Sequence, residues 1–189
     1  MNHNDWQRKI VEVIETLKTR YDHIGSKSGV PFLAVVYPSE AQESFFQEWL
    51  THASAVKQEI TIHHVNVLSI TQQVISELGA DNIVESIDNP LVGSDPQSEL
   101  GKLWISSIVK AVNSTFDKIA TPKPVVCLTH LAALYPATGP RSLMQALWGD
   151  GQGNLKGPVI LFIPGTISGT RKYCFLCQQE EFMYRGDLL

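Results

Sequence analysis

The residues of this chain that could hold phosphate lie in one glycine-containing segment, Gly165-Thr-Ile-Ser-Gly-Thr-Arg-Lys172. A phosphate-binding P-loop has two glycines separated by four residues, followed directly by a lysine and then a serine or threonine. Here Gly169 comes one residue early, and Lys172 does not follow a glycine. The segment Tyr37-Pro-Ser-Glu-Ala-Gln-Glu43, which follows the first apolar run, contains neither glycine nor lysine. The sequence therefore predicts no Walker A motif, and it favours a turn between strands at Gly165 and Gly169.

Other residue types that could do chemistry also lack the required spacing. Ser168 stands three residues after Gly165, whereas a nucleophile elbow places its serine two residues after the first glycine. Cys174-Phe-Leu-Cys177 lacks the second ligand pair of a zinc site, and His63-His64 falls within a predicted strand, where neighbouring side chains face opposite sides. We therefore expect no catalytic residues, no cofactor and no metal, and we interpret the cysteines as reduced, packed thiols.

Apolar patterning predicts the elements that would position such residues. Short apolar runs without alternation are typical of strands buried on both faces of a parallel sheet, and spacings of three and four indicate amphipathic helices. Strands are expected at residues 31–37, 59–68, 125–129, 159–163 and 172–177. Helices are expected at residues 4–24, 39–53, 69–78, 95–119 and 140–148, with a short helical pattern and loop over 81–94 and a turn over 150–157. Ser39, Ser69 and Asp95 are the expected helix N-caps.

Strands that alternate with helices predict a single α/β domain over residues 1–189. We expect a three-layer parallel sheet with helices on both faces, P-loop-NTPase-like or Rossmann-like but without a Walker A motif.

Composition narrows the classes of protein further. A hydrophobic content of 43% is enough for a packed core, and a net charge of −4 argues against a dedicated nucleic-acid-binding protein. The apolar runs are too short to span a membrane, and the polar first nine residues predict no secretory signal, so a cytoplasmic protein is expected. The charge is uneven: residues 1–120 carry nine bases and fifteen acids, and residues 121–189 carry six bases and four acids.

Three stretches together resemble one family. They are Tyr37-Pro-Ser-Glu-Ala-Gln-Glu-Ser-Phe45, Leu128-Thr-His-Leu-Ala-Ala-Leu-Tyr-Pro136 with Arg141-Ser-Leu-Met-Gln-Ala-Leu147, and Gly157-Pro-Val-Ile-Leu-Phe-Ile-Pro-Gly-Thr166. In order and spacing, together with Tyr184-Arg185, they are similar to the BrxB family of BREX bacteriophage-exclusion systems. The resemblance implies a bacterial cytoplasmic antiviral defence protein without a catalytic motif. It also implies other BREX subunits as partners: a PglZ-type protein of alkaline-phosphatase-like fold first, then the large ATPase or the DNA methyltransferase.

The predicted function is accordingly that of a non-catalytic adaptor acting through protein–protein interaction. Loops after the strands of an open α/β sheet form its binding sites, and tyrosine and arginine dominate interface energies. The candidate partner-binding residues are Tyr135, Pro136, Arg141, Gly165, Thr166 and Arg171.

Two alternatives stay open from the sequence. One is a nucleotide-binding or hydrolysing enzyme on a P-loop-like fold. The other is a DNA-contacting module that uses four bases near the C-terminus, although these are scattered and predict no DNA binding by the chain alone. These bases are Lys156, Arg171, Lys172 and Arg185.

Overall fold

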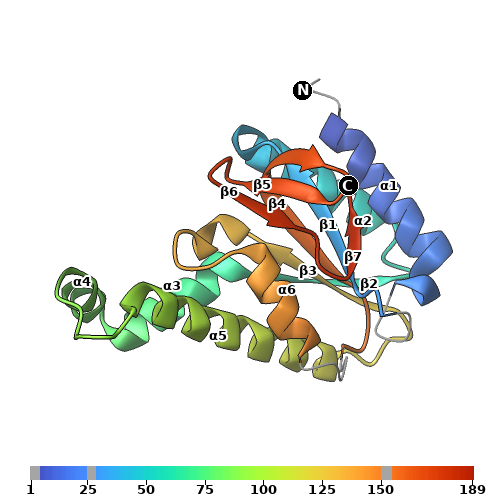
Figure 1. Ribbon diagram of the computed structural model, residues 1–189. Coiled ribbons are helices and arrows are strands. Elements are labelled where there is room, and N and C mark those ends of the chain that lie inside the picture. The colour runs from blue at the N-terminus through green and yellow to red at the C-terminus, as the bar shows by residue number, and fades with distance from the viewer. Residues whose placement is uncertain (1–4, 25–28, 150–154) are drawn as a thin grey trace.

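The computed structural model describes residues 5–24, 29–149 and 155–189, and these form helices and strands in alternation (Figure 1). The helices are α1 (Asp5–Arg20), α2 (Gln42–Ala55), α3 (Val67–Leu78), α4 (Ala80–Asp88), α5 (Pro96–Lys118) and α6 (Pro140–Trp148). The strands are β1 (Phe32–Tyr37), β2 (Thr61–Asn66), β3 (Pro124–Thr129), β4 (Val159–Gly169), β5 (Lys172–Phe175), β6 (Gln179–Phe182) and β7 (Gly186–Leu188).

Five of the strands make a parallel sheet in the order β2-β3-β4-β1-β7. Alternate residues of each strand enter different cores, because successive side chains of a strand point to opposite faces. Leu33 and Val35 pack with α1 and α2 on one face, whereas Ala34 and Val36 pack with α3, α5 and α6 on the other. The structure thus confirms the predicted three-layer α/β fold.

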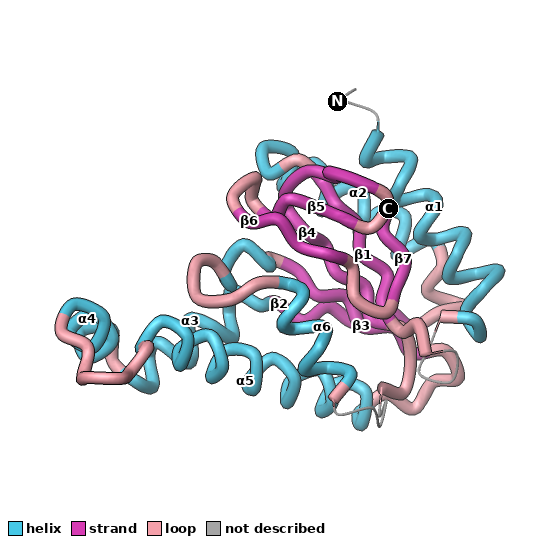
Figure 2. The backbone as a smooth tube through the Cα atoms, in the orientation of Figure 1, coloured by secondary structure: helices cyan, strands magenta, loops and turns pink. Residues whose placement is uncertain are grey.

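Strand β4 continues beyond the predicted run and bends into an antiparallel hairpin with β5, to which β6 is added (Figure 2). Gly165 allows this passage, since it has φ +151° and a Cβ there would collide with the carbonyl oxygen of Cys174. Thr170 and Arg171 then turn the chain between β4 and β5, directly after Gly169, where a turn was predicted. The turn predicted at Gly165 is wrong, because this residue lies within β4 and pairs with Phe175.

Two of the three expected helix caps are wrong. A 3₁₀ turn (Ser39–Ala41) precedes α2, which has no side-chain cap, so Ser39 does not begin the helix. Helix α3 begins two residues before Ser69, because the side chain of Asn66 accepts a hydrogen bond from the Ser69 amide. Asp95 does cap α5, accepting from the amide of Ser98 at 3.1 Å. The expected start at Asn4 and residues 150–154 of the expected turn lie outside the described residues.

The end of α3, helix α4 and the start of α5 extend away from the sheet (Figures 1 and 2). Helix α4 has no buried residue and contributes to neither core. We call residues 78–103 the helical arm. Among the described residues, no helix has the length and apolar content needed to cross a membrane.

Candidate functional site

The carboxyl edge of the sheet, where open α/β sheets place their sites, holds a pocket between α2 and the ends of β2 and β3. Its volume is about 560 Å³. The lining is aromatic and polar and comes from three elements that meet at this edge. It consists of Gln42, Glu43, Phe46, Gln47, Trp49, Leu50, His64, Asn66, Thr129 and His130.

Aromatic contacts fix the walls of this pocket. The ring of Phe46 stacks on His130 with centroids 5.0 Å apart, and the indole Nε1 of Trp49 donates to His64 Nε2 at 2.8 Å. Partial burial, followed by the neighbouring His63, lowers the pKa of His64 below its ordinary value. His64 is therefore neutral at pH 7, which suits its role as the acceptor of the Trp49 hydrogen bond.

The pocket contains one nucleophile beside one base. Thr129 Oγ1 lies 3.1 Å from His130 Nδ1, but the threonine is buried and also donates to the carbonyl of Val65 at 3.5 Å. Among the described residues, no carboxylate bonds to His130 and orients it, as a triad requires. The contact between Thr129 and His130 follows from the local structure after β3. There His130 adopts φ +58° and starts the following 3₁₀ turn.

The same edge offers little to a phosphate group. No lysine or arginine lines the pocket, and Glu43 stands in the first turn of α2, where a nucleotide-binding fold would place phosphate. Glu40, in the preceding turn, adds a second exposed carboxylate. Both charges repel phosphate.

The predicted partner residues after β3 are accessible. Tyr135 is 42% exposed, and Pro136 and Arg141 are also exposed. The carbonyl oxygen of Pro136 accepts a hydrogen bond from Gln97 Nε2 of α5 at 3.1 Å, which ties this loop to the base of the helical arm. The guanidinium of Arg141 lies over the ring of Phe182 in β6.

The other three predicted partner residues were expected in the loop after the fourth strand, but Gly165 and Thr166 lie within β4, and only Arg171 follows it. Arg171 is exposed and donates to the carbonyl of Met183, and Thr166 is partly exposed and lies 3.9 Å from Cys177 Sγ. Gly165 is buried and serves the backbone passage described above. Since Arg141 and Arg171 both contact the β6 region, the hairpin brings the two predicted groups to one side of the molecule.

A buried carboxylate that sequence reasoning missed holds this side together. Glu181 is 5% exposed and accepts hydrogen bonds from the Tyr173 hydroxyl at 2.6 Å, the Arg141 amide at 2.9 Å and Gln179 Nε2 at 3.1 Å. It therefore caps α6 from another element. Burial, and then the nearby Glu181 charge, raises the pKa of Tyr173 well above its ordinary value, so the hydroxyl stays a donor.

The cysteine and histidine candidates are dispersed. Cys127 is buried, which raises its pKa well above the ordinary value, but Cys177 is exposed and Cys174 partly so. The prediction of a packed thiol is wrong for Cys177, because it falls in the turn after β5 rather than in the strand. Cys174 lies in β5 as predicted, but it is only partly buried. Within the described ranges, no three His, Cys, Asp or Glu side chains are grouped so as to hold a metal ion.

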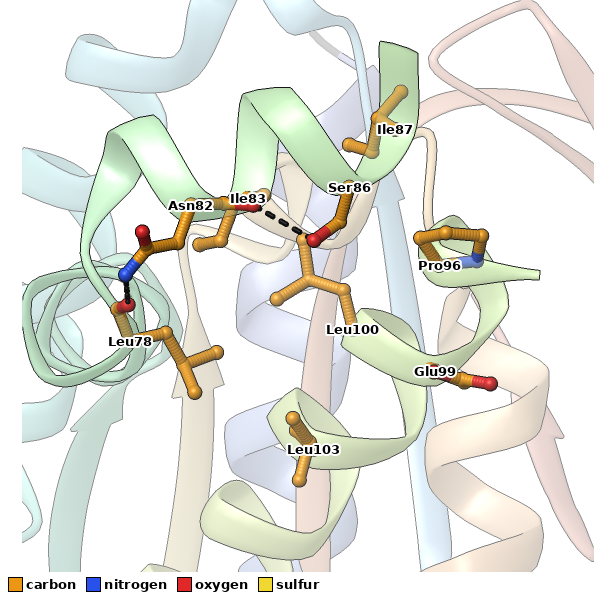
Figure 3. Close-up of a pocket in the computed structure, with 9 residues that line it drawn as sticks. All are labelled: Leu78, Asn82, Ile83, Ser86, Ile87, Pro96, Glu99, Leu100 and Leu103. Atoms are coloured by element: carbon orange, nitrogen blue, oxygen red, sulfur yellow. Dashed lines mark hydrogen bonds between the residues drawn. The ribbon is translucent and has the colours of Figure 1, made fainter. Parts of the chain in front are cut away.

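The helical arm carries a second concavity, which the sequence did not predict. Apolar side chains from α3, α4 and α5 converge on a groove between α4 and the first turns of α5 (Figure 3). The groove comprises two adjoining hollows of about 190 and 390 Å³ that share Asn82, Ser86, Pro96 and Glu99. No base lines either hollow.

Comparison with protein-family models, with curated proteins and with solved structures finds no match.

Proposed function

We propose that this chain is a non-catalytic adaptor of a bacterial BREX antiphage system that binds other BREX subunits. The system is inferred from the resemblance to the BrxB family. The observation that supports an adaptor is the uncovered apolar surface of the helical arm. Leu91 is 81% exposed and Val92 is 106% exposed, whereas monomeric proteins rarely leave contiguous apolar surface uncovered.

Two features of the carboxyl edge favour binding over chemistry. Its histidines are engaged in contacts within the fold, His64 with Trp49 and His130 with Phe46 and Thr129. Its charges, Glu40 and Glu43, oppose the nucleotide alternative. The first partner we propose is the PglZ-type protein, with the large ATPase or the methyltransferase as further partners.

A pull-down from the native system tests this proposal. The tagged chain should retain the PglZ-type protein, and Tyr135→Ala or Arg171→Glu should reduce retention if the hairpin side takes part. A Val11→Glu variant, altered on the solvent side of α1, is the control for folded protein with a changed surface. Failure of the unmodified chain to retain any BREX subunit would overturn the adaptor function.

A further inference from the structure

The helical arm leaves its apolar side chains uncovered. Every other helix of six or more residues in the described part of the chain buries residues in a core, but α4 buries none. Six apolar residues of the arm are exposed although they belong to types that usually pack inside. These are Leu78, Val84, Ile87, Leu91, Val92 and Leu103.

Four of them, Leu78, Ile87, Leu91 and Leu103, border a groove rather than a flat surface. Figure 3 shows Ile83 and Ile87 of α4 above Leu100 and Leu103 of α5, with Leu78 closing one end. The neighbouring hollow extends the groove toward Leu91. Two helices that flank an apolar groove present the surface into which a third amphipathic helix lays its apolar face.

The groove lies in an acidic segment of the chain, and two of its lining residues, Glu85 and Glu99, carry carboxylates that form its acidic rim. The arm contains five acids and one base, Lys102, and no lysine or arginine occurs between Lys57 and Lys102. None of the ion pairs among the described residues uses an acid of the arm. The five carboxylates, all on exposed residues, are Asp81, Glu85, Asp88, Asp95 and Glu99.

Together, apolar floor and acidic rim define one kind of occupant. We infer that the groove binds a basic amphipathic helix of another protein, with apolar residues at i, i+3, i+4 and i+7 and lysine or arginine beside them. Opposite charge at the rim steers such a helix and fixes its direction. The inference rests on the proposed function in one respect, that the chain acts by binding another protein.

A second copy of this chain does not supply that helix. Two arms facing each other would bring like charges together, which disfavours association. The basic residues of α1 and α5 lie on helices whose apolar faces are already buried in the cores. The described part of the chain therefore offers no free basic amphipathic face of its own.

Synthetic peptides test the chemistry directly on the full chain. The probe is a fluorescent peptide of three Leu-Lys-Lys-Leu-Leu-Lys-Leu heptads, measured by anisotropy. One comparison peptide replaces every lysine by glutamate, and another has the same composition shuffled so that no apolar face forms. We expect the lysine helix to bind at least about tenfold more tightly than either, with affinity falling as salt is raised.

Matched variants assign the binding to the groove. Ile87 of α4 and Val11 of α1 are both 44% exposed, so Ile87→Glu and Val11→Glu place the same charge on equally accessible helical sites. Ile87→Glu adds an acid to an acidic arm and would strengthen a purely electrostatic attraction. We expect it instead to weaken binding about tenfold, because it places a charge against the peptide's leucines, and Val11→Glu to leave binding unchanged.

A charge variant tests the rim. Glu85→Gln with Glu99→Gln should weaken binding about threefold and flatten its salt dependence, whereas Glu12→Gln with Glu15→Gln on α1 should not. Circular dichroism verifies that each variant is folded.

Several results would overturn the inference. They are absence of binding by the lysine helix, equal binding by the shuffled peptide, equal binding by the glutamate helix, or equal affinity of the Ile87→Glu and Val11→Glu variants. The outcome of the pull-down, which tests the adaptor function, does not depend on the outcome of these peptide measurements. A BREX complex without peptide binding would reject the groove and keep the adaptor, and peptide binding without a complex would do the reverse.

Discussion

The sheet and the helical arm both carry large apolar side chains, but these side chains have opposite surroundings. Every residue of β1 and β3 is buried, so each of their side chains is covered by a helix or a neighbouring strand. Helix α4 carries Ile83, Val84 and Ile87 in one short stretch and buries none of them. Burial on folding is what makes an apolar side chain stabilising. The apolar residues of the sheet therefore account for stability, whereas those of α4 contribute little to the isolated chain.

The largest expected effect contrasts one residue from each region. Phe162 of β4 is fully buried and packs against Trp49 at 4.8 Å and Phe45 at 5.1 Å between ring centroids. Phe162→Ala should lower the free energy of unfolding by about 3–5 kcal/mol, measured by urea denaturation. Ile87→Ala should change it by less than about 0.5 kcal/mol. Equal losses would show that the arm is part of the cooperative core.

The next effect concerns the junction of the two regions. Gly101 of α5 is buried, and a Cβ there would lie 2.5 Å from the carbonyl oxygen of Ala137. Alanine in place of a helical glycine ordinarily stabilises by about 1 kcal/mol. Here Gly101→Ala should instead destabilise by about 1–3 kcal/mol, since the contacting loop must move. Ser106→Ala, at an exposed site of the same helix, is the control and should change the thermal midpoint little. A rise in midpoint for Gly101→Ala would mean that the loop yields freely.

The smallest expected effect is the pH dependence of stability that His64 of β2 gives to the sheet region. The folded-state pKa of His64 is lowered, so the unfolded chain binds its proton first as pH falls. The stabilising contribution of neutral His64 is thus complete above about pH 6.5 and declines as pH drops below that value toward the folded pKa. His64→Gln keeps an acceptor for Trp49 but does not titrate, so the decline in unfolding free energy between neutral and mildly acidic pH should be shallower. Identical pH profiles for both proteins would contradict the assignment.

Sequence patterns predicted the buried part of this fold better than its edges. The apolar run of Pro31–Tyr37 identified β1 because a strand covered on both faces needs no polar residue. The sequence did not predict β6 or β7. The residues of β6, Gln179–Phe182, are mostly polar and pair through their backbone in a hairpin. The cap on α3 was misplaced because Asn66 and Ser69 are both good capping residues, and only the structure shows which one accepts the hydrogen bond.

Some of the candidate site residues could also be predicted from the sequence, and others could not. Positions that follow β3 and β4 could be predicted from the general geometry of open α/β sheets. Tyr135 and Arg171 are accessible in the connections after these strands, and Arg141 is accessible in the first turn of α6. The role of Glu181 could not be predicted, because its partners Tyr173 and Arg141 reach it from separate elements. The periodicity of residues 81–94 indicated a helix but not that its apolar face would stay uncovered. The acids of this segment were visible in the sequence and could have indicated that the helix stays exposed.

The position of β1 within the sheet has a consequence during synthesis. Phe32 pairs with Val159 of β4 on one side and Gly186 of β7 on the other. Both neighbours leave the ribosome long after β1 does, so this wholly buried strand has no strand partner while the residues between β1 and β4 are synthesised. Such a segment favours aggregation or chaperone binding while it waits. The sheet therefore closes around β1 only after both β4 and β7 have been synthesised.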